Sequence, residues 1–247
     1  EVKLDDPLGN AKRSAVYEWK RAADRLEQPV DKDEWFMSPQ TVNAYYNPSF
    51  NEIVFPAAIL QPPFFDVNAD PAINYGGIGG VIGHEMGHGF DDQGSKTDAD
   101  GILRNWWTPD DEAKFKERVA ALGAQYGAFE PLPGIKVNGD LTMGENIGDL
   151  GGVEVAHEAY KLSLNGATPE VKDGFTGEQR FFLGWAQVWK GMYRPELMQM
   201  LLASDPHSPP EFRVNGVVPN IPAFYEAFKI QPGDKLYLDP AKRVKIW

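Results

Sequence analysis

Two histidines stand four residues apart in the run His84-Glu85-Met86-Gly87-His88. In a helix, residues at this spacing lie on the same face, one turn above the other. Two imidazoles so placed can bind one metal ion, while Glu85 reaches a water molecule held beside the ion. The alternative is that the two histidines share a helix by chance or for packing, because the pattern fixes only three positions. The run predicts a metal-dependent hydrolytic centre, and other parts of the chain must complete it.

A catalytic zinc site takes three protein ligands and leaves one coordination position open for water. Glu145 is the candidate third ligand, and Asp149 projects from the same helix face four residues later. One such carboxylate can bind the metal while the other holds the second nitrogen of a ligating histidine. Asp91 is the natural partner of this kind for His88. The alternative for Glu145 and Asp149 is an ordinary acidic helix face exposed to solvent. The alternative for Asp91 is a carboxylate that faces water at the helix end, a description that fits Asp92 better.

Apolar periodicity places these residues on helices and predicts a small sheet. Residues 41–46 and 51–55 read as two short strands, and the turn between them suggests an antiparallel pair with a free outer edge. The histidine pair falls on a helix over 74–92 and the acidic pair on a helix over 142–164. Further helices are predicted over 11–28, 109–126 with Thr108 as its cap, 176–193, 195–204 and 222–229. The helix over 176–193 is rich in aromatic residues and is expected to be buried.

The segment before His84 has an unusual density of glycine. Glycine is costly inside a helix, so its excess indicates close approach of another helix or of a ligand. A phosphate-binding loop is excluded, because no Lys-Ser/Thr follows the glycines. A calcium loop over 98–101 is not favoured either, because the later acidic ligand is missing.

Composition narrows the class of protein further. The 247 residues are 42% hydrophobic, and no linker divides them, so a single catalytic domain over 1–247 is expected. The net charge of −12 argues against nucleic acid or an anionic membrane surface as a partner. The absence of cysteine excludes disulfides and a thiolate metal site. The sequence shows no apolar run that could span a bilayer, no signal peptide and no initiating Met, so a fragment or a processed piece is one reading. A soluble bacterial cytoplasmic, periplasmic or secreted location stays open.

Further stretches extend the pattern along nearly the whole chain. They are VNAYYNP at 42–48, ILQPPFF at 59–65, NYGGIG at 74–79 leading into HEMGHGFDD at 84–92, GENIGD at 144–149, YRPE at 193–196, HSP at 207–209, FRV at 212–214, and Trp247. Together they resemble the catalytic half of the neprilysin-type (M13-like) zinc metalloendopeptidases, a family that includes endothelin-converting enzyme and bacterial oligopeptidases. Any one stretch alone would be far less specific.

The resemblance implies a role for each matching residue of the metal centre. His84, His88 and Glu145 would bind one Zn²⁺ per chain, and Glu85 would be the general base that activates the zinc-bound water. Asp149 would orient His84, and Asp91 would orient His88.

The same resemblance implies roles in substrate binding. His207 would stabilise the oxyanion and Arg213 would bind a substrate carbonyl, although by themselves the two read as a loop histidine and a surface arginine. Asn43 and Ala44 would pair with the peptide backbone. The pocket for the side chain after the cleaved bond would be lined by Ile59, Phe64, Val81 and Trp189.

The chain also departs from the family pattern. Lys190, Ile230 and Val244 occupy positions where the animal enzymes have cysteine, which points to a bacterial member. Gly80 replaces a larger apolar residue, so the size of the pocket is open. The N-terminal helical lobe of the family is essentially absent, which implies that it is a separate chain or was removed.

The expected fold is α+β, a mainly helical, thermolysin-like zincin with a small, largely antiparallel sheet whose edge receives the substrate as an added strand. The expected function is zinc-dependent endoproteolysis of oligopeptides on the amino side of apolar residues. Two alternatives remain: a non-catalytic peptide-binding module, which Glu85 argues against, and a weakly active fragment without its N-terminal lobe.

Overall fold

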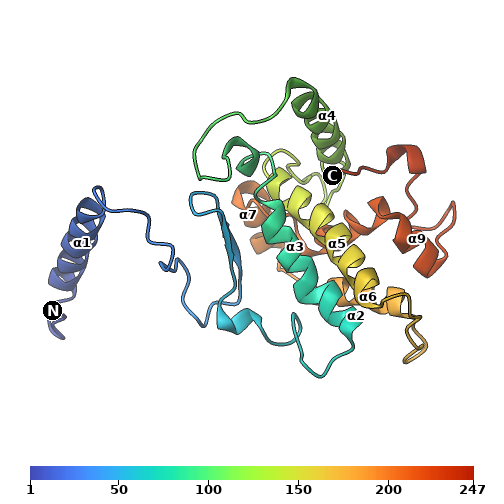
Figure 1. Cartoon of the computed structure of the whole chain (residues 1–247), viewed down its shortest axis with the longest axis horizontal. Coiled ribbons are helices and arrows are strands. Elements are labelled where there is room, and N and C mark those ends of the chain that lie inside the picture. The colour runs from blue at the N-terminus through green and yellow to red at the C-terminus, as the bar shows by residue number, and fades with distance from the viewer. The chain divides into compact units, whose positions relative to one another are not determined.

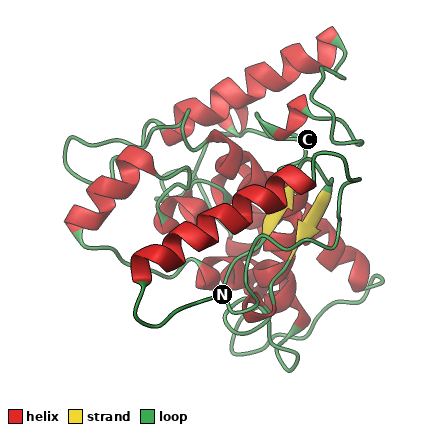
Figure 2. Ribbon diagram, turned by 90° about the vertical axis from the view of Figure 1, so that its left-hand side faces the viewer, coloured by secondary structure: helices red, strands yellow, loops and turns green.

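Helices are the main regular secondary structure of the computed structural model, which describes residues 1–247 (Figure 2). The chain divides into two units, Glu1–Phe36 and Met37–Trp247. Each is described by itself, and the assignment of the whole chain to one catalytic domain stays a prediction. No helix is both long enough and apolar enough to cross a membrane.

The first unit consists of helix α1 (Pro7–Asp24) and the segment that follows it. Asp6 caps the helix by accepting a hydrogen bond of 2.8 Å from the N–H of Gly9. The sequence-based boundaries of 11–28 were too late at both ends. The helix ends at Asp24 and a turn follows it. Glu34, further along the chain, forms ion pairs with Arg21 and Arg25.

The second unit begins with a two-stranded antiparallel sheet, β1 (Tyr45–Asn47) and β2 (Glu52–Val54). Tyr45 lies opposite Val54, and the other edge of β1 has no partner strand. The predicted small antiparallel sheet is confirmed, but the predicted strand 41–46 was wrong at its start. Residues 41–44 do not pair with β2, because β2 ends at Val54, shortly before Pro56, which has no N–H to donate.

His84 lies on a helical stretch that is continuous from Pro71 to Gly87, and His88 directly follows this stretch as its C-cap. The stretch consists of α2 (Pro71–Asn74), one π-helical turn (Tyr75–Gly79) and α3 (Gly80–Gly87). Asp70 caps the stretch by accepting a 3.0 Å hydrogen bond from the N–H of Ala72. The predicted helix over 74–92 therefore begins earlier and ends earlier, and the residues after His88 form a turn.

Helix α5 (Met143–Ser163) runs beside α3 (Figure 1). A Cβ atom on Gly83 would lie 2.6 Å from the carbonyl oxygen of Gly152, so only glycine permits this approach. The predicted cause of the glycine excess, close approach of another helix, is confirmed. This contact brings the acidic pair of α5 to the two histidines.

The remaining elements surround this pair of helices. Helix α4 begins after its Thr108 cap, as predicted, and α6 ends five residues before the predicted boundary of 193, where Trp189 leaves helical geometry. Helix α8 was not predicted. The bounds are α4 (Pro109–Tyr126), α6 (Gly177–Val188), α7 (Pro195–Ser204), α8 (Pro210–Asn215), α9 (Pro222–Phe228) and the 3₁₀ turns Ala57–Ile59, Gly94–Lys96, Val218–Asn220 and Pro240–Lys242.

The core is rich in aromatic side chains from α6, as the sequence indicated. Phe181 and Trp185 are fully buried, together with Ile147 and Leu150 of α5. The indole N–H of Trp185 donates a 3.0 Å hydrogen bond to the carbonyl oxygen of Arg213. This bond ties α6 to α8, the short helix that carries Arg213, and so fixes α8 against the site.

Candidate metal centre

Three side chains from two helices converge at one point. The Nε2 atom of His84 lies 3.3 Å from Glu145 Oε2, and the Nε2 atom of His88 lies 3.7 Å from Glu145 Oε1. The nearest ligand atoms of the three residues all lie within 4.8 Å of one another. The structure thus brings together the three ligands that the sequence suggested.

The other ring nitrogen of each histidine is held by a carboxylate. His84 Nδ1 lies 2.8 Å from Asp149 Oδ1, and His88 Nδ1 lies 2.8 Å from Asp91 Oδ2. Asp91 reaches His88 through the turn after α3 and not through helical spacing, since α3 ends at Gly87. Both contacts leave Nε2 as the nitrogen available to a metal.

The spacing of the ligand atoms suits Zn²⁺. Zinc binds imidazole nitrogen and carboxylate oxygen at about 2.0–2.2 Å in tetrahedral geometry, which places neighbouring ligand atoms about 3.3–3.5 Å apart. The two histidine–glutamate distances of 3.3 and 3.7 Å are close to this value. The ligand set of two histidines and one glutamate also leaves a fourth position open, as catalytic zinc sites require.

The charges of the centre are strongly coupled. Burial lowers the pKa of His84, but hydrogen bonds to Asp149 and Glu145 outweigh it and raise the pKa to about 9. Burial raises the pKa of Glu145, but His84, Arg213 and His207 together lower it to about 2. Before metal binds, the centre therefore holds a carboxylate and an imidazolium at neutral pH.

Glu85 is buried and lines the same cavity as the three ligands. Burial raises the pKa of its carboxyl group, and the neighbouring His84 and His88 only partly oppose this. A raised pKa suits a group that must take up and give back a proton near neutral pH.

Arg213 joins the metal centre to the pocket. Its Nε and Nη2 atoms each donate a 2.7 Å hydrogen bond to Asp149, and its guanidinium lies 3.8 Å from the centre of the Trp189 ring. Burial raises the pKa of Asp149, but Arg213 and His84 together outweigh it and lower the pKa. The sequence suggested a surface arginine or a substrate ligand, whereas Arg213 is buried and paired.

His207 lies at the edge of the centre, on the loop between α7 and α8. Its Nε2 atom is 3.3 Å from Glu145 Oε2, and its Nδ1 atom is 2.7 Å from Asp205 Oδ1. The imidazole is therefore aimed at the ligand carboxylate, although its side chain is 46% exposed.

A cavity of about 610 Å³ opens onto the three ligands. All the residues that the sequence assigned to substrate binding line it, from Asn43 and Ala44 on the segment before β1 to Arg213 on α8. Sequence reasoning missed Trp185, Tyr46, Gln93 and Thr97, which line it too. Trp185 carried a signal, because it was expected to be a buried aromatic residue one turn before Trp189.

Trp185 also explains the small residue at position 80. A Cβ atom on Gly80 would lie 2.7 Å from the Trp185 ring, so the tryptophan fills the space that a larger side chain would take. Gly80 thus leaves room for Trp185, whose side chain lines the cavity.

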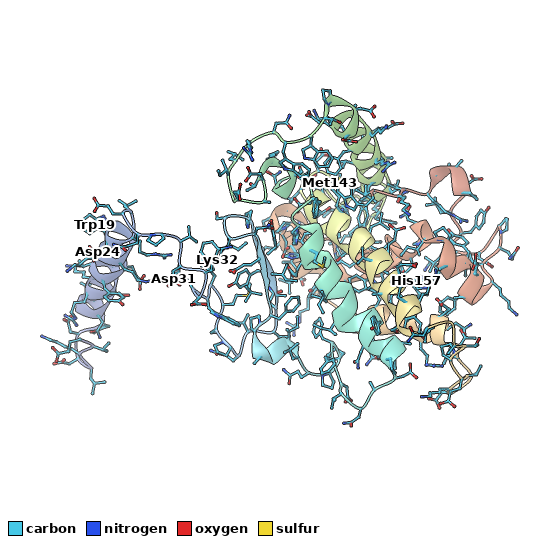
Figure 3. The ribbon with its side chains drawn as sticks, in the orientation of Figure 1. Trp19, Asp24, Asp31, Lys32, Met143 and His157 are labelled. Carbon is cyan, nitrogen blue, oxygen red and sulfur yellow. The ribbon has the colours of Figure 1, made fainter.

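The fourth histidine, His157, lies outside the centre. It is on α5, about 18 Å along the helix axis from Glu145, and Figure 3 labels it together with Met143, the first residue of that helix. His157 pairs with Glu178 of α6 and stacks on Phe182. Asp98 likewise has a local role, since its Oδ1 atom accepts hydrogen bonds from the N–H groups of Asp100 and Ile102.

The fold and the site define a mainly helical metal-binding domain whose ligand set is of the catalytic type. Comparison with known sequences gives the family: the profile of peptidase family M13 matches residues 43–244, and the chain belongs to that family. The resemblance that the sequence suggested is confirmed, and so is the mainly helical α+β class.

Two curated relatives and one solved structure show the extent of the likeness. The chain is 44% identical over 241 residues to endothelin-converting enzyme 1 of Bos taurus, covering 96% of this chain and 32% of that protein. It is 47% identical over 231 residues to neprilysin-1 of Caenorhabditis elegans, covering 90% and 30%. The structure of Mycobacterium tuberculosis zinc metalloprotease Zmp1 in complex with inhibitor superposes with a TM-score of 0.95 at 59% identity, covering 98% of this chain and 38% of that one. The chain spans about a third of the length of the curated relatives.

Proposed function

We propose that this chain carries the active site of a zinc-dependent endopeptidase that hydrolyses oligopeptides on the amino side of apolar residues. The observation that carries the proposal is the convergence of His84, His88 and Glu145, with the buried Glu85 in the same cavity. Membership of peptidase family M13 supports it. The proposal concerns this site, because the chain spans about a third of its curated relatives.

One zinc ion per chain would be held by the Nε2 atoms of the two histidines and by the carboxylate of Glu145. Bound zinc supplies Lewis-acid chemistry: it polarises the scissile carbonyl and makes water a better nucleophile at neutral pH. Asp149 and Asp91 hold the imidazole rings with Nε2 facing the ion.

Glu85 moves the proton. It accepts a proton from the water molecule as the oxygen of that water bonds to the carbonyl carbon. It then delivers the proton to the amide nitrogen as the carbon–nitrogen bond breaks. The products are a carboxylic acid and an amine, so no further reactant is required.

His207 stabilises the negative charge that develops on the carbonyl oxygen. Its Nε2 atom lies 3.3 Å from Glu145 Oε2, and His207 lines the same cavity, from which an N–H could reach that oxygen. A donor in this role is worth about 2.7–4 kcal/mol of transition-state stabilisation. Arg213 would bind a substrate carbonyl while its hydrogen bonds to Asp149 keep it in place.

The edge of β1 that does not pair with β2, together with the segment before it, would bind the peptide backbone as an added strand. Asn43 and Ala44 lie on this segment and line the cavity. The N–H of Ala44 donates a 3.0 Å hydrogen bond to Asn43 Oδ1, so a bound peptide would exchange this local bond for its own. Ile59, Phe64, Val81 and Trp189 would receive the apolar side chain after the cleaved bond.

A digest of a peptide library tests the proposal. The purified chain, with its zinc content measured, is incubated with the library with and without a chelator, and the cuts are mapped by mass spectrometry. We expect chelator-sensitive cuts before apolar residues. Cuts that persist after zinc removal would contradict the proposal.

Replacement of the base gives the matched control. Glu85→Gln keeps the size of the side chain but removes the proton acceptor, so we expect turnover to fall at least 10²-fold, the lower end of the usual contribution of a general base. Zinc content should stay at the wild-type level, because Glu85 is not a ligand. Equal activity in wild type and variant would refute the assigned base.

A weakly active fragment is the second candidate, and the short span of the chain relative to its relatives favours it. The same digest separates the two. Slow cleavage by the zinc-loaded chain, if it is lost in Glu85→Gln, would show a working active site and would support the weakly active fragment. Zinc-loaded chain without any such cut would support a non-catalytic binding module.

A further inference from the structure

A buried hydrogen bond links the two segments that carry Glu145 and His207. Asn146 directly follows Glu145 on α5, and Ser208 directly follows His207 on the loop before α8. The hydroxyl of Ser208 donates a 2.7 Å hydrogen bond to Asn146 Oδ1. Asn146 is 0% exposed and Ser208 is 2% exposed, so water does not compete for this bond.

The acceptor is itself held in place. Asn146 Nδ2 donates a 2.9 Å hydrogen bond to Thr142 Oγ1, and the Thr142 hydroxyl donates a 3.1 Å bond to the carbonyl oxygen of Asn138. Thr142 is buried as well. The amide of Asn146 is therefore fixed at both ends, and its oxygen is a rigid anchor for the loop.

The side chain of His207 itself contacts α5 through Glu145, at 3.3 Å. Its Nδ1 atom contacts Asp205, which belongs to the same loop, so this contact sets the direction of the ring within the loop. Its own side chain is 46% exposed. The buried bond from Ser208 to Asn146 also crosses from the loop to the helix that carries Glu145.

We infer that Asn146 and Ser208 form a positioning pair that sets the distance between His207 Nε2 and the zinc ligand Glu145. This inference rests on the proposed function. Neither residue touches the substrate, and each acts through its neighbour in sequence. Loss of the bond leaves a buried amide oxygen without a donor, so the loop must shift to hydrate it. A shift of about 1 Å at a catalytic group can reduce the rate about 10²-fold.

Kinetics of Ser208→Ala test the inference, with and without His207→Ala. We expect kcat for the peptide identified by the digest to fall tenfold or more, with KM and zinc content within twofold of wild type. In the His207→Ala background, Ser208→Ala should lower kcat less than twofold, because the imidazole that Ser208 positions is absent. Ser163→Ala is the matched control: it removes a 2.7 Å serine hydrogen bond to the Tyr160 carbonyl at the other end of α5 and should leave kcat within twofold.

A kcat loss from Ser208→Ala that is the same in both backgrounds would overturn the inference, and so would no loss at all. Ser208→Cys is a gentler variant for the case that Ser208→Ala does not fold. It keeps a weak donor and should lose kcat to a smaller extent than Ser208→Ala, again only when His207 is present.

A second readout does not depend on activity. The imidazole NMR signals of the four histidines are recorded for the zinc-loaded protein, and His207→Ala identifies the signal of His207. We expect Ser208→Ala to move or broaden the His207 signal and to leave that of His157 in place. An unchanged His207 signal would overturn the positioning role, whereas a wild type that cuts no peptide would refute only the proposed function.

Discussion

At the scale of single residues, the centre contains a chain of paired buried charges. Arg213 neutralises Asp149, Asp149 holds His84, and His84 faces Glu145. Such a network is costly to break at one point, because removing one charge leaves its buried partner uncompensated. The residue types and spacing in the sequence indicated the proposed ligands and the carboxylates that the structure places beside the two histidines. They could not indicate the pairing of Arg213 with Asp149, because that depends on how α8 packs.

The pKa of His84 implies that the stability of the metal-free protein depends on pH. The folded pKa, about 9, lies above the ordinary value of 6.5. Its contribution to stability is therefore fully present below pH 6.5 and is lost as the pH rises through about 9. We expect the urea-unfolding free energy of chelator-treated protein to fall over this range.

His84→Gln provides the comparison for this effect, because glutamine does not titrate. Between pH 6.5 and 9, the metal-free variant should lose less stability than the metal-free wild type. Parallel curves for the two proteins would show that His84 does not carry the charge assigned to it.

At the scale of elements, the site exists because α3 and α5 approach closely. Glycine residues on both helices allow this approach, and Gly148 of α5 also makes room for the imidazole ring of His84. A Cβ atom on Gly148 would lie 2.8 Å from His84 Nδ1, the nitrogen that Asp149 holds.

We expect Gly148→Ala to displace the His84 ring and weaken zinc binding about 10–100-fold, the usual effect of disturbing the partner of a ligating histidine. Competition with a chelating indicator measures the affinity. Gly151→Ala on the same helix is the control, since its Cβ atom would meet only the side chain of Trp247, at 3.3 Å. Zinc affinities that fall equally in both variants would point to a general effect on α5.

The faces of the helices could be predicted from the sequence more accurately than their ends. The spacing of His84 and His88 and of Glu145 and Asp149 predicted the helices and their functional faces, because periodicity is a local property. Helix ends were less accurate, since they depend on contacts made later in the chain, such as the ion pairs of Glu34 with α1. The short α8 was missed because Pro209 and Pro210 read as a loop.

At the scale of the whole molecule, we expect metal binding to be coupled to folding, because the proposed ligands come from segments 57 residues apart in the sequence, His88 and Glu145. A ligand that binds only the folded state stabilises it by about 4.1 kcal/mol when its free concentration is 1,000 times Kd. We expect zinc to raise the melting temperature of the chelator-treated chain. Glu145→Ala should abolish most of this rise, and a variant that responds to zinc as wild type does would contradict the ligand assignment.

The structural similarity to solved M13-type proteins extends over nearly all of this chain, and not only over the segments that carry the site. The central claim about the site is that His84, His88 and Glu145 bind a single zinc ion. Anomalous X-ray diffraction at the zinc edge, on crystals of the zinc-loaded chain, tests this directly. We expect one peak per chain, about 2.0–2.2 Å from the Nε2 atoms of His84 and His88 and from a carboxylate oxygen of Glu145. A zinc peak elsewhere, or one bound by the histidines with Glu145 remote from it, would contradict the account.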